Sequence, residues 1–450
     1  MIGVNLLKFI TKLLKYLARI KTANLSLFLI YFVFLIPINI RAQKLKSVNL
    51  QEYGAITTKE INETIKKAIN DIEGKCLILP SINLDLNNII IKNKKNFALT
   101  GSLENYISCK NFQINSCSNF EISNIFIKGT IKKFTYFDII GNCNSFTIHD
   151  CKFTSEKDKN NKYTFYGIHV KGNNSNNNIN YNNSPRNFKI YNNEVNNTKY
   201  NGILVHAHCS NYIINNNIVN NAQCIGIESE GRLGGNSNTT VHPCKNGIIK
   251  NNIIKNCGDW GILVNWTSNL LIYNNETINC HGCFLSIGCK NVVVNKNSFE
   301  GNRKGFEISQ EFFSLQKGYN TNIIVTNNII KCMARAENRA VLDIRHAKDI
   351  KVNKNNIISI YKDNTAYISV GSSQKIKIKN NTFKHSDKML PFTILMNNVI
   401  DPETLDEVKE MNNYKITIKN NRFFNIEENS NYNNLRLNSI SAKIKNKYIK

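Results

Sequence analysis

A repeating alternation of apolar and polar residues dominates the chain between residues 199 and 297. Each unit has a short strand of the form G-I-x-V-x, a polar turn, a second apolar strand and an Asn-Asn pair, as at Asn251–Asn252 and Asn274–Asn275. These two pairs are 23 residues apart, and an earlier interval is lengthened by the insertion LGGNSNTTVHPC. A β-rich period just above twenty residues predicts a parallel β-solenoid whose coils bury their apolar sides by stacking.

The many asparagines favour the same architecture. Asn tolerates the left-handed backbone conformation of tight turns and can hydrogen-bond its own backbone. Stacked turns also bring Asn amides into ladders along the axis, as in cross-β stacks. We therefore expect the Asn-Asn pairs to mark the turns between strands.

Aligning the G-I-x-V-x strands predicts which side chains share a face. Seven such strands begin at Gly167, Gly202, Gly226, Gly261, Cys283, Gly305 and Val341. Side chains alternate along a strand, so the second and fourth positions point inward and the third and fifth point outward. Coils stack about 4.8 Å apart. Three consecutive coils therefore present one outer face that carries His169, Lys171, His206, Glu228 and Glu230.

The first 42 residues predict a secretory signal peptide, or a signal anchor if they are not cleaved. They hold six basic and no acidic residues, an apolar run over Leu25–Ile40 and a small residue, Ala42, at a plausible cleavage point. We expect an exported body that is secreted, periplasmic or at the cell surface, with no membrane span in the mature chain if the signal is removed.

Residues 43–80 predict an N-terminal cap with one helix. A capping box at Thr57–Glu60 precedes an apolar helix face, and Gly74 ends the helix. That face consists of Ile61, Ile65, Ile69 and Ile72. A short strand over Cys76–Leu79 stops at Pro80. The coils are expected to fill residues 81–426, and residues 427–450 are expected to form a basic tail.

This cap resembles the N-terminus of pectate-lyase-like β-helix proteins, the superfamily of polygalacturonase-type glycosidases and polysaccharide lyases. The matching residues are Val48, Tyr53, Gly54, Ala55, Leu79 and Pro80. The resemblance implies an all-β, right-handed parallel β-helix with an N-terminal capping helix, acting on polysaccharide. Ile56-Thr57-Thr58 replaces the usual acidic stretch. The polygalacturonase motifs N-x-D, D-D, G-H-G and R-I-K do not appear in that order, and D-P-H is absent, so the resemblance specifies a fold rather than a reaction.

The charge balance favours an anionic partner. The formal net charge is +26, from 58 basic and 32 acidic residues, and would be +20 without residues 1–42. Acidic polysaccharide, nucleic acid and an anionic surface all suit this excess, although a general abundance of Lys would also produce it. Aromatic residues do not interleave with basic residues on one face, which disfavours nucleic acid. The thirteen cysteines, all after residue 42, are expected mainly in the interior rather than in zinc sites, with one or two disulfides left open.

Two kinds of cleavage chemistry suit the predicted outer face. In a lyase a base removes the proton beside a uronic carboxylate while a cation neutralises that carboxylate. Lys171 or His206 would be the base, and Arg232 or Lys171 the cation. In a glycosidase two carboxyls flank the bond, and Glu228 and Glu230 have Cα atoms about 6.6 Å apart by strand rise.

A metal site and a purely structural role are the other interpretations. Glu228 and Glu230 offer oxygens for calcium, and His206 with His208 would suit a transition metal. Alternatively, the polar side chains only pair across strands. The expected substrate-binding residues around the catalytic candidates are His169, His208, Arg232, Asn265 and Trp266. Loops at 157–163, 172–186 and 233–244 are expected to wall the site.

A second polar cluster, in later coils, is expected to be surface ion pairing. It consists of Glu307, Glu311, Asp343, Arg345 and His346. The sequence thus predicts an exported β-helix protein that cleaves an acidic polysaccharide by lyase or glycosidase chemistry. The alternative is a non-catalytic surface or adhesive β-helix that binds glycan. Convergence of Lys171, His206, Glu228 and Glu230 in a cleft would favour the enzyme.

Overall fold

The computed structural model describes residues 45–54, 60–172, 183–231, 242–309, 319–332, 340–359, 368–385, 390–391, 394–397, 415–424, 426–427 and 443–449. Contacts divide the chain into two units, residues 1–42 and 43–450, and all described residues belong to the second. The predicted signal segment, Arg232 and Glu311 lie outside the described residues, as do most of two predicted wall loops, at 173–182 and 232–241.

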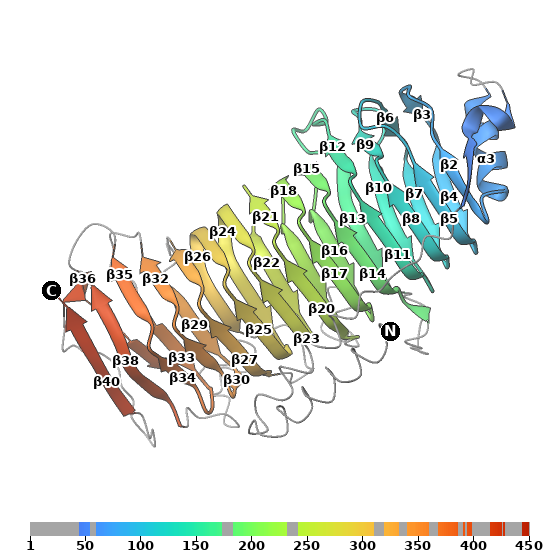
Figure 1. Cartoon of the computed structure of the whole chain (residues 1–450). Helices are drawn as coiled ribbons and strands as arrows, with labels where there is room; N and C mark the ends of the chain where they lie inside the picture. Colours follow the sequence, from blue (N-terminus) through green and yellow to red (C-terminus); the bar gives the residue numbers. More distant parts are fainter. Residues whose placement is uncertain are drawn as a thin grey trace, which may run out of the picture. The chain divides into compact units, whose positions relative to one another are not determined.

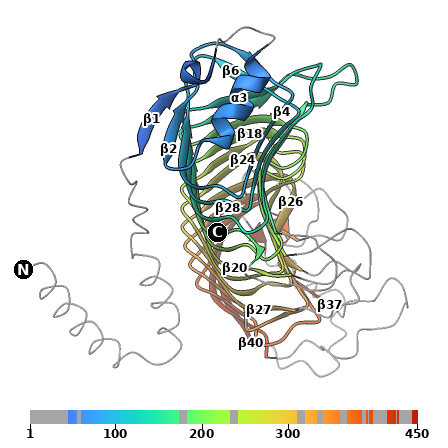
Figure 2. The same cartoon turned by 90° about the vertical axis from the view of Figure 1, so that its right-hand side faces the viewer.

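The N-terminal cap has the predicted helix. Strand β1 (Lys46–Asn49) leads into the 3-10 helix η1 (Leu50–Tyr53), and α3 (Ile61–Asn70) follows. The buried side chains of α3 include Ile61, Ile65 and Ile69, and the helix packs on the first coil at β4. Its N-cap residue is Glu60, whereas the predicted cap Thr57 lies outside the described residues. Figure 2 shows α3 beside the first strands of the stack.

The rest of the described chain winds through three stacks of parallel strands, which we call ladders I, II and III (Figure 1). Ladder I comprises β4 (Asn88–Lys92), β7 (Asn111–Asn115), β10 (Thr135–Ile140), β13 (Phe165–Lys171), β16 (Ile203–His206), β19 (Ile227–Glu230), β22 (Trp260–Asn265), the C-terminal parts of β24 (Glu276–Ile287) and β26 (Ser298–Ser309), β29 (Leu342–Arg345), β33 (Ile368–Gly371) and β37 (Ile394–Asn397).

Ladder II comprises β1, β2 (Lys75–Ile78), β5 (Lys95–Thr100), β8 (Ser118–Ser123), β11 (Asn144–His149), β14 (Arg186–Tyr191), β17 (Ser210–Asn215), β20 (Cys244–Lys250), β23 (Thr267–Tyr273), β25 (Lys290–Asn295), β27 (Asn320–Thr326), β30 (Ala347–Lys348), β31 (Lys351–Asn353), β34 (Lys377–Lys379), β38 (Thr417–Phe424) and β40 (Lys443–Ile449). Strand β40 lies inside the expected basic tail and pairs in parallel with β38. The segment KIKNKYI repeats the alternation of TIKNNRFF, which the sequence analysis overlooked.

Ladder III comprises β3 (Leu84–Asp85), β6 (Tyr106–Ser108), β9 (Phe126–Gly129), β12 (Lys152–Ser155), β15 (Glu194–Thr198), β18 (Ile218–Ala222), β21 (Ile253–Lys255), the N-terminal parts of β24 and β26, β28 (Ile329–Cys332), β32 (Asn356–Ser359), β35 (Thr382–His385) and the C-terminal part of β38. The short strands β36 (Leu390–Pro391) and β39 (Ile426–Glu427) pair only with each other.

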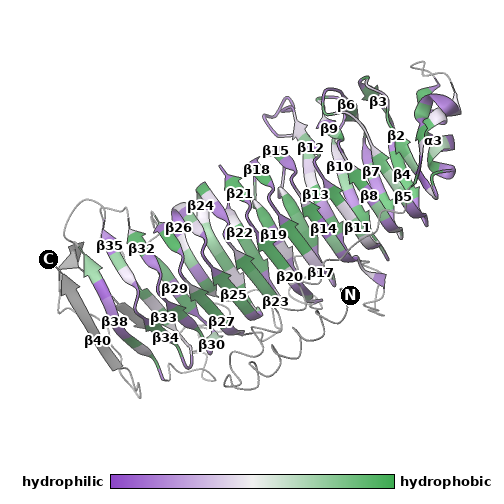
Figure 3. Cartoon of the chain, viewed as in Figure 1, coloured by the Kyte–Doolittle hydropathy of each residue, from purple (hydrophilic) through white to green (hydrophobic). Residues whose placement is uncertain are grey.

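The core is the inside of the coils. Inward residues such as Ile168, Ile203 and Ile227 are fully buried. Along ladder II, stacked rings follow one another at centroid distances of 4.7 to 5.6 Å, in the order Phe97, Phe120, Phe146, Phe188 and Tyr212. Figure 3 shows the apolar residues running from strand to strand across the stack. Each coil therefore supplies only part of a core that its neighbours complete.

A column of buried asparagines joins nine coils at one turn. Its members are Asn193, Asn217, Asn252, Asn275, Asn297, Asn328, Asn355, Asn381 and Asn421. In each step the side-chain amide donates to the next Asn Oδ1, as from Asn252 to Asn275 at 2.9 Å. The backbone N–H of the donating asparagine also donates to that oxygen, as from Asn252 to Asn275 Oδ1. The predicted Asn ladder is confirmed, with the second Asn of each pair buried and the first, such as Asn274 (φ 52°), left-handed.

All thirteen cysteines are free thiols, and eleven of them are buried, the other two being Cys76 and Cys224. This confirms that the cysteines serve mainly as small interior residues. Among the described residues there is no helix with the length and apolar character needed to cross a membrane.

Candidate functional site

The strand pairing of ladder I confirms the predicted alignment of the G-I-x-V-x strands. Ile168 pairs with Ile203 and Ile203 with Ile227, so His169 lies in register with Leu204 and then Glu228. Two positions further along each strand, Lys171, His206 and Glu230 are also in register. Because inward Ile and Val residues fix which side chains face the core, the five candidates share one outer face over three coils, as expected.

The N-terminal end of this face is an ion-paired group centred on Asp138, which the sequence analysis did not select. Asp138 pairs with His169 in strand register, and its Oδ1 lies 3.1 Å from Lys171 Nζ and 3.5 Å from His169 Nδ1. Burial acts to raise the pKa of Asp138, but His169 and Lys171 outweigh it and lower that pKa. Burial lowers the pKa of His169, which is 7% exposed. Asp138 is therefore a carboxylate held beside a lysine and a mostly neutral imidazole.

The two predicted catalytic glutamates have different surroundings. Glu230 is partly exposed, and its Oε2 lies 3.7 Å from His206 Nε2. Glu228 is only 6% exposed and accepts a hydrogen bond from the buried Asn201 side chain, whose Oδ1 in turn accepts from the Ile225 backbone. The four catalytic candidates thus lie on one outer face, with Lys171, His206 and Glu230 partly exposed and Glu228 buried two positions earlier on β19.

Of the remaining predicted substrate-binding residues, Asn265 and His208 are buried and Trp266 is half-buried. Asn265 is in register with Glu230 and is 4% exposed. His208 is 3% exposed, and its ring centroid is 4.2 Å from that of His242. Trp266 has a left-handed backbone (φ 47°), and its ring lies against Gly288, where an added Cβ would come within 2.9 Å of it. Arg232, the fifth candidate, is among the residues not described.

Beyond Glu230 the outer face of ladder I becomes apolar and then ionic again. A small cluster contains Ile225, Trp260, Leu263, Leu285 and Ile287. Further on, Arg345 Nη2 lies 2.6 Å from Asp343 Oδ2 and 4.0 Å from Glu307 Oε2. The expected ion pairing of this second cluster is confirmed for these residues. Its expected surface position is wrong for the carboxylates, since Glu307 and Asp343 are 3% and 1% exposed.

The sequence analysis missed an aromatic pocket beside Asp138. Tyr136 and Tyr166 stack with ring centroids 4.0 Å apart, and Tyr200 lies 5.1 Å from Tyr166. A β-bulge places the two stacked rings on the outer face, because Tyr166 and Gly167 together oppose Tyr136. Only glycine fits the bulge at Gly167 (φ 114°), where a Cβ would be 2.0 Å from the Asn201 carbonyl oxygen.

Lysines complete this pocket, which has a volume of about 740 Å³. The expectation that aromatic and basic residues do not interleave on one face is therefore wrong here, because a bulge and a turn bring together residues that the sequence keeps apart. Lys199 Nζ lies 4.8 Å from the ring centroids of both Phe134 and Tyr166 and donates to Tyr166 Oη at 2.9 Å. Burial acts to raise the pKa of Tyr166, but the Lys199 and Tyr136 hydrogen bonds outweigh it and lower that pKa. Burial raises the pKa of Tyr136 to about 12. The lining residues are Asn87, Asn88, Lys110, Lys132, Lys133, Phe134, Tyr136, Tyr166 and Lys199; we call the site the aromatic–lysine pocket.

The one predicted wall loop that is fully described, residues 157–163, adjoins the start of β13. It is a tight turn in which Lys157 and Tyr163 form an antiparallel bridge (Figure 1, after β12). In the parts of the chain that are described, no group of three or more His, Cys, Asp or Glu side chains is arranged to hold a metal ion. Of the two glutamates considered for calcium, Glu228 accepts a hydrogen bond from Asn201 and Glu230 faces His206.

Comparisons with known proteins identify the fold. The sequence profile of the family described as right handed beta helix region matches residues 236–357. No curated protein sequence matches the chain. Among solved structures, the catalytic unit of an α-1,3-glucanase from Streptomyces thermodiastaticus aligns over 91% of this chain and 69% of its own, with 10% identity and a TM-score of 0.56.

Two further solved structures are similar. PfbA, a surface adhesin of Streptococcus pneumoniae, aligns over 76% of this chain and 90% of its own, with 13% identity and a TM-score of 0.54. The pre-mature gene product 12 of bacteriophage phi29 aligns over 88% of this chain but only 51% of its own, with 14% identity and a TM-score of 0.51. Identities this low establish a common architecture and not a common activity. The chain therefore has an all-β, right-handed parallel β-helix fold with a short N-terminal capping helix.

Proposed function

We propose that this protein is a polysaccharide-active β-helix that cleaves an acidic polysaccharide by β-elimination on the outer face of ladder I. The observation that carries the proposal is the adjacency of two features on β10 and β13. Tyr136 and Tyr166 form a stacking surface beside lysines, and Asp138, His169 and Lys171 follow on the same strands. Aromatic rings suit the apolar faces of sugars, and lysines suit their carboxylates.

The charges favour a lyase over a glycosidase. A glycosidase needs two carboxyls on either side of the bond, one of them protonated. Here His169 and Lys171 lower the pKa of Asp138. Glu228 is buried and accepts a hydrogen bond from the Asn201 side-chain amide. A lyase instead needs a cation that neutralises the uronate and a base beside it. Lys171 and Lys199 supply cations on this face.

In the proposed reaction His206 removes the proton next to the uronate carboxylate, with Glu230 orienting its ring. The electron pair forms a carbon–carbon double bond as the glycosidic oxygen leaves and takes a proton from water. Tyr166, held by Lys199, is the alternative base, for a sugar bound over the aromatic–lysine pocket instead. The neutralising cation is Lys171, while His169, His208, Asn265, Trp266 and Arg232 remain predicted contributors to binding.

The alternative is a non-catalytic glycan-binding or adhesive protein. One observation favours it: Lys171 and His206 each have an acidic partner within the face, which a salt-paired wall would also show. The fold accommodates both roles, since one structural neighbour is a glucanase and another an adhesin. Under either function we propose that residues 1–42 direct export, so that the protein is secreted, periplasmic or at the cell surface.

The test is an assay of the purified protein against acidic and neutral polysaccharides, with and without calcium. Absorbance of unsaturated uronate and new reducing ends would be followed together. The His206→Asn variant should lower kcat about 100-fold or more with little change in KM. Lys199→Gln should mainly raise KM, whereas the control Lys152→Gln, on ladder III, should change neither.

Three results would count against the proposed reaction or its base. Reducing ends without absorbance would indicate a hydrolase. Absorbance that survives in His206→Asn and in Tyr166→Phe would place the base elsewhere. Binding of glycan without either signal would establish the alternative.

A further inference from the structure

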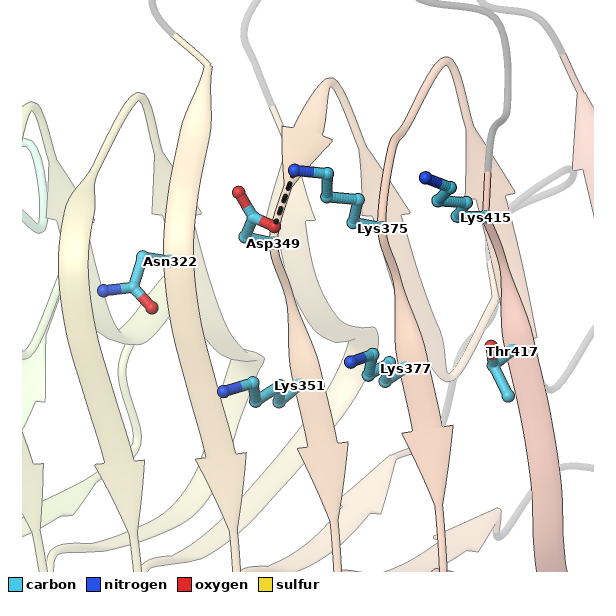
Figure 4. A pocket seen from close by; sticks show the side chains of 7 residues that line it. All are labelled: Asn322, Asp349, Lys351, Lys375, Lys377, Lys415 and Thr417. Atoms are coloured by element: carbon cyan, nitrogen blue, oxygen red, sulfur yellow. Dashed lines mark ion pairs between the residues drawn. The ribbon is translucent and has the colours of Figure 1, made fainter. Parts of the chain in front are cut away.

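A second surface with unusual charge lies on ladder II, far along the chain from the candidate site. Strands β31, β34 and β38 pair with Lys351 opposite Lys377, and Lys377 opposite Thr417. The inward residues between them, Val352, Ile378 and Ile418, are fully buried, so the lysines face outward. With Lys375 and Lys415 at the preceding turns, they line a hollow of about 620 Å³ (Figure 4). We call this the lysine surface.

The lysines of this surface occupy in-register positions of ladder II that carry other residue types in earlier coils. Upstream, the column that contains Lys351 and Lys377 is aliphatic, through Leu271, Val293 and Ile324. The turn before these strands carries a second series of hydrogen-bonded asparagines, separate from the buried column, which includes Asn291 and Asn322. In later coils Asp349, Lys375 and Lys415 take their places with the same left-handed backbone. Lysine is a poorer choice than asparagine for that conformation, although Lys296 and Lys354 also adopt it. What distinguishes this surface is that lysines gather in two adjacent columns.

The hollow has few negative charges of its own. Its only acidic lining residue is Asp349, whose Oδ1 is 3.9 Å from Lys375 Nζ. Within the described chain, Lys351 and Lys377 form no ion pair. Like charges directly opposite each other on neighbouring strands repel. The neighbouring Lys379 shows the effect, because burial and the charges of Lys419 and Lys377 lower its pKa. An anionic ligand would relieve this repulsion.

The spacing of the lysines identifies the kind of anion. Each of the three coils contributes one or two of these lysines, so cationic side chains recur about 4.8 Å apart along the axis. This spacing is similar to the length of one sugar unit in an extended polysaccharide. A linear polyuronate carries one carboxylate per sugar and would match this repeat. The hollow has no aromatic lining residue, whereas single-stranded nucleic acid is commonly bound by stacking its bases on aromatic rings.

We propose that the lysine surface binds a linear polyuronate chain, separately from the site on ladder I. The surface holds carboxylates by charge and needs no catalytic group. The proposal does not depend on β-elimination, because a binding protein would use it equally well.

The test compares two double variants with the same loss of charge. Lys351→Gln/Lys377→Gln removes two lysines from the surface, and Lys250→Gln/Lys290→Gln removes two from other strands of ladder II. Binding of oligogalacturonate, its methyl ester and oligo-dT would be measured by calorimetry at low and high salt. Unfolding curves would verify that both variants are folded.

We expect Lys351→Gln/Lys377→Gln to weaken oligogalacturonate binding about tenfold, and the control to weaken it less than about twofold. Salt should weaken wild-type binding, and the methyl ester should not bind. Equal effects of the two variants, equal binding of the ester, or preference for oligo-dT would each overturn the proposal. Cleavage of short oligosaccharides at ladder I should be the same in both variants, so failure here is distinct from failure of the proposed lyase.

Discussion

At the scale of single residues, the buried histidines link the fold to pH. His208 is 3% exposed, and burial, together with the charges of His242 and Lys245, lowers its pKa to about 4. An unfolded histidine has a pKa of about 6.5. Between about pH 6.5 and 4 the unfolded state therefore binds a proton at His208 that the folded state does not bind. This difference lowers the free energy of unfolding as the pH falls through that window.

We predict that His208→Asn makes the protein less sensitive to acid. Asn accepts the left-handed backbone of this position and removes a cost of up to about 1.4 kcal/mol per pH unit in that window. Urea unfolding at about pH 7.5 and 5 would measure it.

His149 serves as a control, because its pKa shifts in the opposite direction to that of His208. Burial acts to lower its pKa, but Glu121 and Asp150 outweigh burial and raise it. Its stabilising effect is complete below the unfolded pKa and is lost as the pH rises through the folded value. His149→Gln should therefore cost more stability at pH 5 than at pH 8. If both variants shift stability in the same direction with pH, the assignment of His208 is incorrect.

At the scale of elements, the capping helix α3 protects the open end of the first coil. Its apolar residues were predictable from spacing alone, because Ile61, Ile65 and Ile69 recur on one face. The paired register of ladder I was also predictable, since a fixed strand motif recurs even where loops lengthen the coils. The aromatic–lysine pocket was not, because Tyr136 lies in the segment TYFDII, which lacks the motif, and a bulge brings Tyr166 beside it.

We predict that Ile65→Ala lowers the free energy of unfolding by about 2–4 kcal/mol, since Ile65 is 3% exposed. Loosening of the cap should also expose strand edges that associate between molecules. Sedimentation and urea unfolding would measure both effects. The neighbouring Lys66→Ala, at an exposed position, should change neither. A monomeric Ile65→Ala variant of unchanged stability would show that α3 does not protect the stack.

At the scale of the whole molecule, the asparagine column ties successive coils together although their lengths differ. Adjacent members are separated by 22 residues in one step and 40 in another, yet they make the same contacts. Long loops therefore leave the stack without changing its register. The sequence predicted this column, but it could not show which Asn of each pair is buried, since both repeat with the same period.

We predict that Asn275→Ala destabilises the protein by about 3 kcal/mol or more, because it leaves several buried donors and acceptors without partners. The adjacent Asn274→Gly, at an exposed left-handed turn, should be nearly neutral. Thermal and urea unfolding would compare the two. Equal losses would mean that the buried column contributes no more than its exposed counterpart.

The constant step between coils also makes the molecule a ruler. Six steps of ladder II separate β14, in the coil of the aromatic–lysine pocket, from β31 on the lysine surface. At about 4.8 Å per step, the two levels are about 29 Å apart along the axis. Gain or loss of one coil would change that axial distance by about 4.8 Å and leave each surface intact. The shortest glycan that reaches both surfaces would therefore change in steps of one coil spacing.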